Sequence, residues 1–305
     1  MSLLSKAKKY LCDKDYRFFV NNAHGLYNHM PDEEYLRRLF KVKMGYELNL
    51  DNPQTYNGKL QWLKLHDRKP IYTTMVDKYE VKKYVADIIG DEYIIPTLGV
   101  WDRFEEIDFD KLPNQFVLKC THDSGGLVIC RDKAQLNLDE AREKITSSLK
   151  QNYYYKFREW PYKSVKPRVI AEEYLEEIGE DQERRRVIND YKIYTFNGEA
   201  KLCMINQDRG VHTRADYFDR DYNWLDFTWG YDHADVTPPK PGNYEKMFQL
   251  AEVLSKDTIE LRVDFYQVNG RIYFGELTFF DGSGFDRIDP IEWDRKMGSW
   301  MNLPI

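Results

Sequence analysis

The sequence predicts an α+β fold divided between two lobes, with a mostly helical region at the N-terminus. Its 305 residues are too many for one compact lobe, and a hydrophobic share of 42% is enough for a sizeable core. Apolar residues recur at helical spacing up to about residue 105, whereas from Phe116 onward they alternate as in strands. We therefore expect a helical region over 1–105, a first lobe over 106–176 and a C-terminal lobe over 177–305.

The N-terminal region contains three amphipathic helical segments. The first opens with three acids at residues 32–34, the second covers 58–66, and the third covers 75–89, where Gly90 stops it. Asp77 lies early in the third segment, where the helix dipole favours an acid.

The two lobes are predicted to consist mainly of strands and hairpins. We expect strands over 116–119, 127–130, 168–175, 190–196 and 199–205, helices over 137–150 and 244–254, and a final hairpin over 261–280. Asn197-Gly198 is a strong turn signal between two of these strands, and Asn137 is placed to cap its helix. Residues 206–243 show neither the helical nor the strand spacing of apolar residues, and we expect them to form a long loop region.

Composition and charge exclude several classes of protein. A net charge of −6 opposes phosphate-backbone binding, so no nucleic acid partner is expected. The cysteines are Cys12, Cys120, Cys130 and Cys203. They show no CxxC spacing, and no His lies near them in a zinc pattern, which suits a reducing compartment. No run approaches about 20 apolar residues and no signal-peptide pattern is present, so we expect a cytoplasmic protein without a membrane span.

The final hairpin admits two registers that place its acids differently. A two-residue Asn269-Gly270 turn puts Asp264 and Glu276 on opposite faces, whereas a three-residue loop from Val268 with Gly270 left-handed puts both on one face. In the second register one face holds Arg262, Asp264, Glu276 and Thr278 with Tyr266, Ile272 and Phe274, and the other holds Leu261, Val263, Phe265, Tyr273, Leu277 and Phe279. We predict this register because it sorts the side chains better, and a one-residue slip would reverse them all.

The predicted register brings the carboxylates of Asp264 and Glu276 together on adjacent strands. Like charges so placed repel unless a cation lies between them. Magnesium fits, because it takes oxygen ligands and commonly binds one or two carboxylates together with substrate phosphates. The alternative is a solvated polar face on which Arg262 neutralises both acids, and the hairpin pattern taken alone favours that alternative.

A glycine-rich loop follows the first strand of the first lobe. Lys119 ends that strand, and Thr121-His122-Asp123-Ser124-Gly125-Gly126 comes after it. Glycines and small hydroxyl residues let backbone N–H groups approach phosphate oxygens, and the lysine supplies a positive charge. No Gly-Lys-Ser/Thr follows, so this is no Walker A loop, and a plain turn is the alternative. The strand over 169–175 could present its backbone to a flat base, or be a plain strand followed by solvated acids.

These motifs are more specific in their order than singly. The order is Asp77-Lys78, Phe116 to Lys119 with the glycine-rich loop, Glu172 to Leu175, Asp190-Tyr191-Lys192, Arg262-Val263-Asp264 and Glu276-Leu277-Thr278. This order resembles the ATP-grasp superfamily, in which two α+β lobes grip ATP. Together with Ile95 to Val100, Leu112-Pro113 and Gly275 to Thr278, it looks like the TupA-like group, which is associated with teichuronopeptide and capsular polysaccharide synthesis. The resemblance covers roughly residues 50 to 290.

The resemblance implies roles for individual residues around the nucleotide. Phosphates would be contacted by Lys78 and Lys119 and covered by a lid that includes Thr121, His122, Ser124, Gly125 and Gly126. Adenine would be held by Glu172, Glu173, Tyr174 and Leu175, the ribose hydroxyls by Asp190, and a phosphate by Lys192. Magnesium would be ligated by Asp264, Glu276 and Thr278, although the superfamily usually has Asn at the position of Thr278, which leaves the second metal position open.

At the reacting centre the resemblance implies that Arg262 stabilises the transferring phosphoryl group. Asp281-Gly282-Ser283-Gly284 follows the metal strand and could aim backbone N–H groups at an acyl phosphate. Arg262, Lys119 and Ser283 are therefore the candidate catalytic residues. The implied activity is that of an ATP- and Mg2+-dependent carboxylate–amine ligase of cell-surface or capsular polysaccharide synthesis, with peripheral association with a polysaccharide assembly left open.

The carboxylate acceptor could bind to either of two clusters. One is Arg184-Arg185-Arg186, for which a solvated basic turn is the alternative, and the other is the segment from Gln207 to Arg214. Rival functions are a sugar or small-molecule kinase on the same fold, a scaffold without catalysis, and a nucleotide-sugar glycosyltransferase. The last would use an Asp-x-Asp motif, which 108–110 and 219–221 both fit, although 51 acidic residues make such triplets common.

Overall fold

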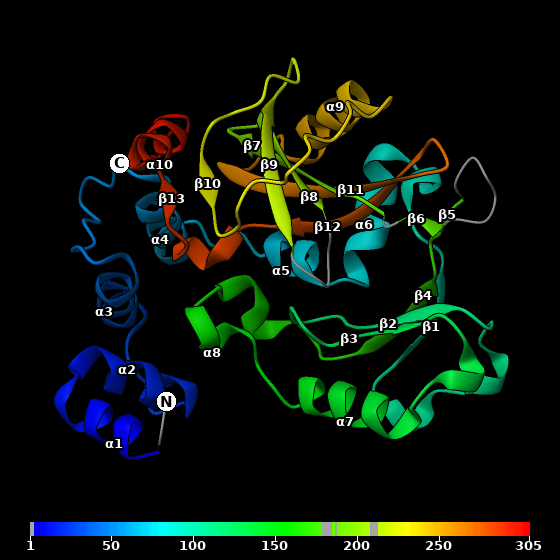
Figure 1. Cartoon of the computed structure of the whole chain (residues 1–305), viewed down its shortest axis with the longest axis horizontal. Coiled ribbons are helices and arrows are strands. Elements are labelled where there is room, and N and C mark those ends of the chain that lie inside the picture. Colours follow the sequence, from blue (N-terminus) through cyan, green and yellow to red (C-terminus); the bar gives the residue numbers. More distant parts are fainter. Residues whose placement is uncertain (1–2, 179–184, 187, 208–212) are drawn as a thin grey trace.

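Two antiparallel sheets, each with a helix packed on one face, form the two lobes (Figure 1). The computed structural model describes residues 3–178, 185–186, 188–207 and 213–305. The smaller sheet has the strand order β1-β4-β2-β3 and the larger has β12-β11-β7-β8-β9. β5 pairs with β6 and β10 with β13 as separate two-stranded sheets. None of the helices described is long and apolar enough to cross a membrane.

The elements have the following bounds. The α-helices are α1 Leu3–Cys12, α2 Lys14–Ala23, α3 Asp32–Met44, α4 Tyr56–His66, α5 Ile71–Val76, α6 Glu80–Ile89, α7 Leu138–Leu149, α8 Tyr154–Phe157, α9 Tyr244–Leu254 and α10 Ile291–Ser299. The strands are β1 Thr97–Trp101, β2 Phe116–Cys120, β3 Leu127–Cys130, β4 Val169–Glu173, β5 Glu177–Ile178, β6 Arg185–Arg186, β7 Asp190–Phe196, β8 Glu199–Gln207, β9 Arg214–Asp219, β10 Thr228–Trp229, β11 Glu260–Val268, β12 Arg271–Thr278 and β13 Ile288–Asp289. Short 3-10 helices are η1 Asp91–Tyr93, η2 Phe104–Glu106, η3 Phe109–Lys111, η4 Lys133–Gln135, η5 Trp160–Ser164 and η6 Asp281–Gly284.

The N-terminal region is helical as predicted, but the helix expected over 75–89 is interrupted. α5 ends at Val76 and α6 begins at Glu80, because Asp77 is extended with φ −74° and ψ 113°. The Asp77 carboxylate accepts from the backbone N–H of Tyr79 at 2.9 Å, as side chains do at the start of a helix. The break therefore lies at Asp77-Lys78, a pair that belongs to the candidate site.

The smaller lobe is formed by the sheet and by α7, which the sequence predicts with its Asn137 cap. Phe116 and Leu118 on β2 and Ala171 on β4 are buried in one core with α7. Because strand residues alternate between faces, Lys119 and Glu172 must point to the opposite face of the sheet. β1 precedes the predicted lobe boundary near residue 105, yet it pairs with β4.

The larger lobe contains the strands that carry most of the candidate site, with α9 packed on β7, β8 and β11. The predicted Asn197-Gly198 turn is present, with both residues at positive φ. The prediction of a long loop over 206–243 is wrong, because β9 and β10 lie within it. Four consecutive residues of β9, 215–218, are buried, so this strand lacks the alternation by which strands are recognised.

The register of the β11–β12 hairpin combines parts of both predicted alternatives. The predicted three-residue loop is wrong, since Val268 pairs with Arg271 across a two-residue turn with Asn269 at φ 51° and Gly270 at φ 76°. A bulge at Gly275 then shifts the register.

Beyond the bulge the acids lie as predicted. Asp264 pairs with Glu276, and Arg262 pairs with Thr278, so these four side chains share one face. On the turn side of the bulge the β12 residues lie on the faces opposite to those predicted. Phe274 pairs with Phe265 on the apolar face, Ile272 lies on that same face opposite Gln267, and Tyr273 pairs with Tyr266 on the polar face.

Candidate active site

Arg262 on β11 is the centre of the polar face of the larger sheet. Its Nε donates to Asp264 Oδ1 at 2.6 Å and its Nη2 to Asp264 Oδ2 at 2.7 Å, a two-pronged contact. The same Nη2 lies 3.0 Å from Glu276 Oε1. One guanidinium therefore neutralises both acids, as the alternative to a metal site predicts, but Arg262 and Asp264 are buried and not solvated.

Two further contacts fix the position of Arg262. Its Nη1 donates to Asp281 in η6, and Asp281 also accepts from the hydroxyl of Tyr194 on β7. The predicted motif at 281–284 thus contacts the arginine through the Asp281 carboxylate.

Lys192 on β7 lies beside Asp264 on the same face. Its Nζ contacts Asp190 Oδ2 at 2.8 Å and also donates to Asp264. Burial and the neighbouring Arg262 oppose the charge on Lys192, but the surrounding acids outweigh both and raise its pKa. Asp190, expected at the ribose, is 2% exposed and is held against this lysine.

The smaller sheet contributes a second group of charges. Glu172 on β4 accepts from Lys119 on β2, whose Nζ lies 2.6 Å away, and from Lys82 on α6, whose Nζ lies 2.5 Å away. Burial would lower the pKa of Lys119, but Glu172 and then more distant anionic groups raise it. The predicted adenine contact Glu172 is thus a buried partner of two lysines, and the sequence analysis did not identify Lys82.

Lys78 connects the polar face of the larger sheet to the glycine-rich loop. Its Nζ lies 3.7 Å from Glu276 Oε2 and donates to the backbone oxygen of Asp123 at 2.6 Å. Its backbone N–H donates to the oxygen of Thr121 at 3.0 Å. We call the set the charged cluster; it comprises Lys78, Lys119, Glu172, Lys192, Arg262, Asp264 and Glu276.

Glu276 is the acid of the charged cluster with the most access to solvent, with 37% of its side chain exposed. Partial burial alone would raise its pKa, but Lys78, Arg262 and further lysines lower the pKa to about 2. Glu276 is therefore ionised at any physiological pH and remains available to a cation.

The glycine-rich loop is anchored at its base and open at its tip. His122 Nε2 lies 3.1 Å from the backbone oxygen of Ser148 on α7, and Asp123 accepts from the Ser148 hydroxyl and from the N–H of Gly126. The Thr121 hydroxyl donates to the Lys166 oxygen at 3.3 Å.

These contacts divide the predicted lid residues into two sets. The side chains of Thr121 and His122 are buried anchors, whereas Ser124 and Gly125 are exposed. A Cβ on Gly126 would lie 2.6 Å from Cys120, which explains the glycine there. The part of the loop free to approach a phosphate is its tip.

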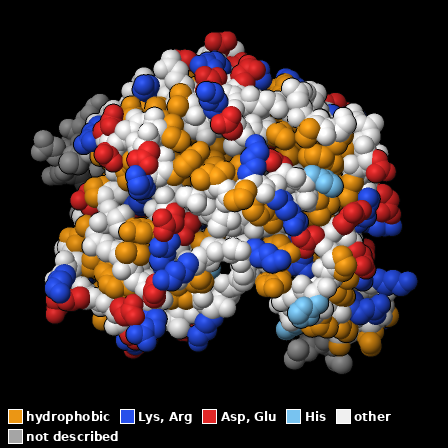
Figure 2. Space-filling model, turned by 180° about the vertical axis from the view of Figure 1, so that it is seen from behind, with side chains coloured by type: hydrophobic (Ala, Val, Ile, Leu, Met, Phe, Trp, Pro, Cys, Tyr) orange, Lys and Arg blue, Asp and Glu red, His pale blue; other side chains and the backbone are white. Residues whose placement is uncertain are grey.

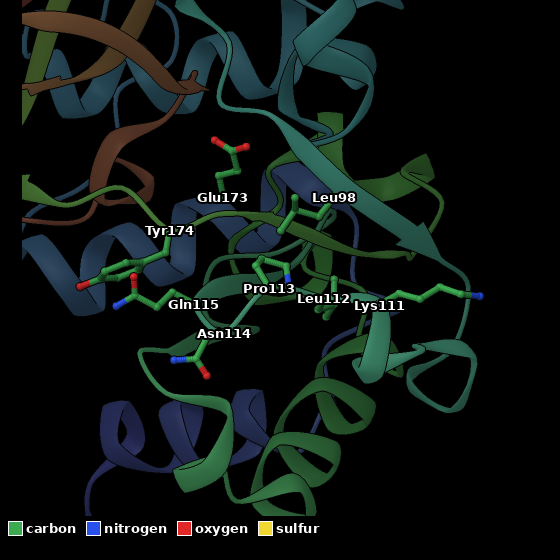
Figure 3. A pocket seen from close by; sticks show the side chains of 8 residues that line it. All are labelled: Leu98, Lys111, Leu112, Pro113, Asn114, Gln115, Glu173 and Tyr174. Carbon is green, nitrogen blue, oxygen red and sulfur yellow. The ribbon is translucent and has the colours of Figure 1, made fainter.

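The predicted adenine residues are divided between two faces of the smaller sheet. Glu173 pairs with Phe116 and lies on the face covered by α7, whereas Glu172 lies on the other. Glu173 and Tyr174 line a pocket of about 580 Å³ with Leu98, Lys111, Leu112, Pro113, Asn114 and Gln115 (Figure 3). Leu175 follows β4 and is half-buried. The pocket is therefore separate from the charged cluster.

Ser283 belongs to a buried group beside Arg262 that the sequence analysis did not identify. Its hydroxyl donates to Glu159, and its backbone oxygen accepts from Lys64 Nζ at 2.7 Å. Burial lowers the pKa of Lys64 to about 7, against the opposing effect of Glu159, whose own pKa is raised by burial. These residues come from three distant parts of the chain, so no local motif could indicate them.

The structure describes the remaining sequence candidates only in part. Arg184 and residues 208–212 lie outside the described residues, and 185–186 form β6. Asp108 accepts from the N–H of Asp110, and Asp219 from the N–H of Asp221. Both Asp-x-Asp triplets therefore shape local turns.

The chemistry of the donors fits magnesium only together with a ligand such as phosphate. Among the described residues no three His, Cys, Asp or Glu side chains form a metal-binding group. Asp264 and Glu276 provide two adjacent carboxylates, and Thr278 Oγ1 lies 3.4 Å from Glu276 Oε1. Magnesium commonly takes one or two carboxylates and completes its shell with phosphates and water.

A model of the TupA-like ATP-grasp family matches residues 58–302, which include the whole charged cluster. The chain belongs to the TupA-like ATP-grasp family. This membership confirms the predicted fold and the predicted class, an ATP-grasp enzyme. No curated protein matches the sequence at the threshold of the comparison.

Several solved ligases resemble this TupA-like chain at a distance. The D-alanine–D-alanine ligase from Bacillus anthracis is 16% identical over 72% of this chain and 57% of its own, with a TM-score of 0.38. The L-amino acid ligase from Bacillus licheniformis is 12% identical over 84% and 57%, with a TM-score of 0.46. An N5-carboxyaminoimidazole ribonucleotide synthetase in complex with ADP is 15% identical over 80% and 56%, with a TM-score of 0.42. The chain spans little more than half the length of these proteins, and the family assignment rests on the family model.

Proposed function

We propose that the charged cluster binds MgATP and that the protein activates a carboxylate for amide formation. The observation that carries the proposal is the arrangement of Lys78, Lys119 and Lys192 around Glu276 and Arg262. Four cations converge there on a few acids, two of which, Asp264 and Glu276, directly face each other. This arrangement suits a polyanion accompanied by a divalent cation better than it suits a neutral ligand.

Each part of the charged cluster would have a distinct task. Lys78 and Lys119 would neutralise phosphate oxygens, and the exposed tip at Ser124-Gly125 would cover them with backbone N–H groups. Arg262, held from three sides by acids, would present a fixed positive charge to the transferring phosphoryl group. Asp264 and Glu276 would hold Mg2+, which when bound neutralises charge on the phosphate oxygens.

The proposed reaction proceeds in two steps. A substrate carboxylate oxygen attacks the γ-phosphorus and ADP leaves, which produces an acyl phosphate. An amine then attacks the carbonyl carbon, phosphate leaves with the bonding electron pair, and the amine loses a proton. Positioning and charge neutralisation suffice for both steps, so no nucleophilic side chain is required.

The substrate is proposed to be a carboxylate-bearing sugar or amino-acid unit of a cell-surface polysaccharide. The support is the family, since the TupA-like resemblance is to proteins associated with such polymers. A protein handling those substrates would act in the cytoplasm, where ATP is present.

The nucleotide part is tested by thermal unfolding with ATP and Mg2+. Binding to the native state should raise the Tm in proportion to the logarithm of ligand concentration. Asp264→Asn and Glu276→Gln should abolish turnover while the apo protein keeps its fold. A rise in Tm with a UDP-sugar but not with MgATP would overturn the proposal and indicate a nucleotide-sugar glycosyltransferase.

The ligase part is tested by mass spectrometry of reactions that contain ATP, a uronic acid and a panel of amines and amino acids. An amide product with one phosphate released per turnover supports the proposal. A stable phosphate ester as the only product would make the protein a kinase.

A further inference from the structure

The two N-terminal helices, α1 and α2, are a part of the molecule that the proposed function does not use. The family model begins at residue 58, beyond both of them. They lie away from both sheets, at the N-terminal extreme of the structure (Figure 1). Their surface therefore has to be explained by something other than nucleotide chemistry.

α1 packs on α2 through only a small part of its surface. The Tyr10 hydroxyl donates to Asn21 at 2.7 Å, and Arg17 Nη1 donates to the backbone oxygen of Leu11 at 3.1 Å. Residues 5–9 are all exposed, and the Leu11 side chain is 72% exposed. Nothing in the described chain covers this side of α1.

The exposed surface of α1 is amphipathic. Ala7 and Leu11 lie one turn apart and share a face of the helix. At the spacing of an α-helix, Lys6 and Lys8 flank that face on its two sides. Lys9 is turned elsewhere, with its Nζ 4.9 Å from the centre of the Tyr16 ring. An apolar face with a lysine on either side is typical of helices that lie in a membrane interface.

The charge of the pair differs from that of the whole protein. Residues 3–23 contain five Lys or Arg and two Asp or Glu, whereas the complete chain has a net charge of −6. Figure 2 shows Lys and Arg side chains beside hydrophobic ones on the projection at its lower right, which is the N-terminal end seen from behind. This end of an acidic molecule therefore carries a net positive charge, which favours its approach to an anionic surface.

We propose that α1 docks the protein on an anionic lipid surface, with Leu11 in the interface and Lys6 and Lys8 against the lipid headgroups. Charge complementarity favours this occupant over a second copy of the chain, because two copies would bring these lysines against each other. The proposal does not depend on the nucleotide site, which lies in other elements.

The test is co-sedimentation of the full-length protein with vesicles. Vesicles of phosphatidylglycerol and phosphatidylcholine in equal parts should bind the protein, vesicles of phosphatidylcholine alone should not, and added salt should weaken the binding. Lys6→Gln combined with Lys8→Gln should lower partitioning by about 25-fold, since each lysine near an anionic surface contributes about fivefold. Leu11→Glu should lower it by about tenfold or more, because an apolar side chain is lost from the interface.

Matched controls come from α9, where Lys246 and Val253 are also exposed. Lys246→Gln removes one exposed lysine charge and Val253→Glu places an acid at an exposed apolar position, both on another helix, and each should leave partitioning unchanged. Thermal unfolding establishes that each variant is folded. Absence of binding to the anionic vesicles, equal binding to both kinds, or equal losses in the α9 variants overturns the proposal. So does a dimer in the absence of lipid that Leu11→Glu converts to a monomer, since α1 would then be a self-association surface.

Discussion

Asp264 lies directly opposite Glu276 across β11 and β12, although the turn between these strands would by itself place Gly275 there. With Val268 paired to Arg271, regular pairing would continue to Asp264 and Gly275, and Glu276 would join Val263 on the apolar face. The bulge takes Gly275 out of the pairing and brings Glu276 to the face of Arg262. Bulges of this kind often redirect a side chain beside a functional site.

Gly275→Ala should therefore disturb the site. A Cβ at this position would lie 3.1 Å from the backbone oxygen of Asp264 and 3.1 Å from the Tyr266 ring, closer than about nine in ten such contacts. We expect the free energy of unfolding to fall by about 1–2 kcal/mol. We also expect kcat for ATP turnover to fall by about tenfold or more, because the two carboxylates are displaced relative to each other.

Gly242→Ala is the matched control, because a Cβ there meets no atom within 4 Å. It should change neither stability nor kcat. Urea unfolding and a coupled ADP-release assay measure the two quantities. Normal activity of Gly275→Ala would mean that the bulge has no role in placing the acids.

The hairpin also illustrates what the sequence could and could not predict. The pattern of apolar and polar residues correctly placed Arg262, Asp264, Glu276 and Thr278 on one face, because burial of the other face enforces that sorting. The same pattern gave a wrong prediction for the turn. A three-residue loop and a two-residue turn followed by a bulge both place the acids on the same face. Only the pairing of the backbone, which depends on Gly275 being accommodated, distinguishes the two.

Removal of Arg262 should make the site depend on magnesium. In Arg262→Gln the acids Asp264, Glu276 and Asp281 lose their common partner in a largely buried place. Loss of one partner from such a pair destabilises a protein by about 3–5 kcal/mol. We expect a lower Tm that added Mg2+ partly restores, even without ATP, because a divalent cation can replace the guanidinium.

Arg220→Gln is the control for this experiment. Arg220 also bridges two acids, Glu245 and Glu252, but at the surface and away from the charged cluster. Its replacement should lower the Tm little, and Mg2+ should not restore it. If the Tm of Arg262→Gln does not respond to Mg2+, Asp264 and Glu276 bind the arginine and do not hold a metal ion.

The depressed pKa of Glu276 should be visible in the pH dependence of stability. A carboxylate with a pKa of about 2 in the folded protein, against about 4.3 when unfolded, stabilises the fold in its ionised form. That stabilisation is complete above about pH 5 and is lost as the pH falls toward 2. Wild type should therefore exceed Glu276→Gln in stability at neutral pH, and the difference should shrink below pH 5.

Urea unfolding of both proteins in the apo state at a series of pH values measures that difference. If the difference in the free energy of unfolding stays constant down to the lowest pH at which both proteins fold, the cations around Glu276 do not stabilise its ionised form. Because the side chain is partly exposed, added salt should reduce the effect.

Contacts between distant segments were beyond the sequence analysis. Lys64 and Glu159 occur in unremarkable local contexts, and charged residues are usually exposed, so nothing indicated that they form a buried group with Ser283. The break at Asp77 was missed for a similar reason. The apolar spacing continues from α5 to α6 while the backbone does not, because the Asp77 side chain takes over backbone hydrogen bonds.

Ser148→Ala should weaken the binding of ATP through the glycine-rich loop. Ser148 on α7 donates to Asp123, and Asp123 also accepts from Gly126 N–H and, through its backbone oxygen, from Lys78. Without the hydroxyl the base of the loop loses an anchor, so the tip is less well ordered for phosphate. A hydrogen bond to a charged group contributes about 1.5 kcal/mol or more, so the half-saturating ATP concentration should rise about tenfold.

The neighbouring Ser147→Ala is a closely matched control, because Ser147 is exposed on the same turn of α7. It removes the same hydroxyl without touching the loop and should leave ATP binding unchanged. Two quantities are measured for both variants: the half-saturating ATP concentration and the Tm of the apo protein. A Tm that falls in Ser148→Ala while the ATP dependence stays at its wild-type value would assign the contact to the stability of α7 alone. A change in ATP dependence with an unaltered Tm would instead show that Ser148 acts through the position of the loop, since a merely structural contact has no reason to alter nucleotide binding in a protein that remains fully folded.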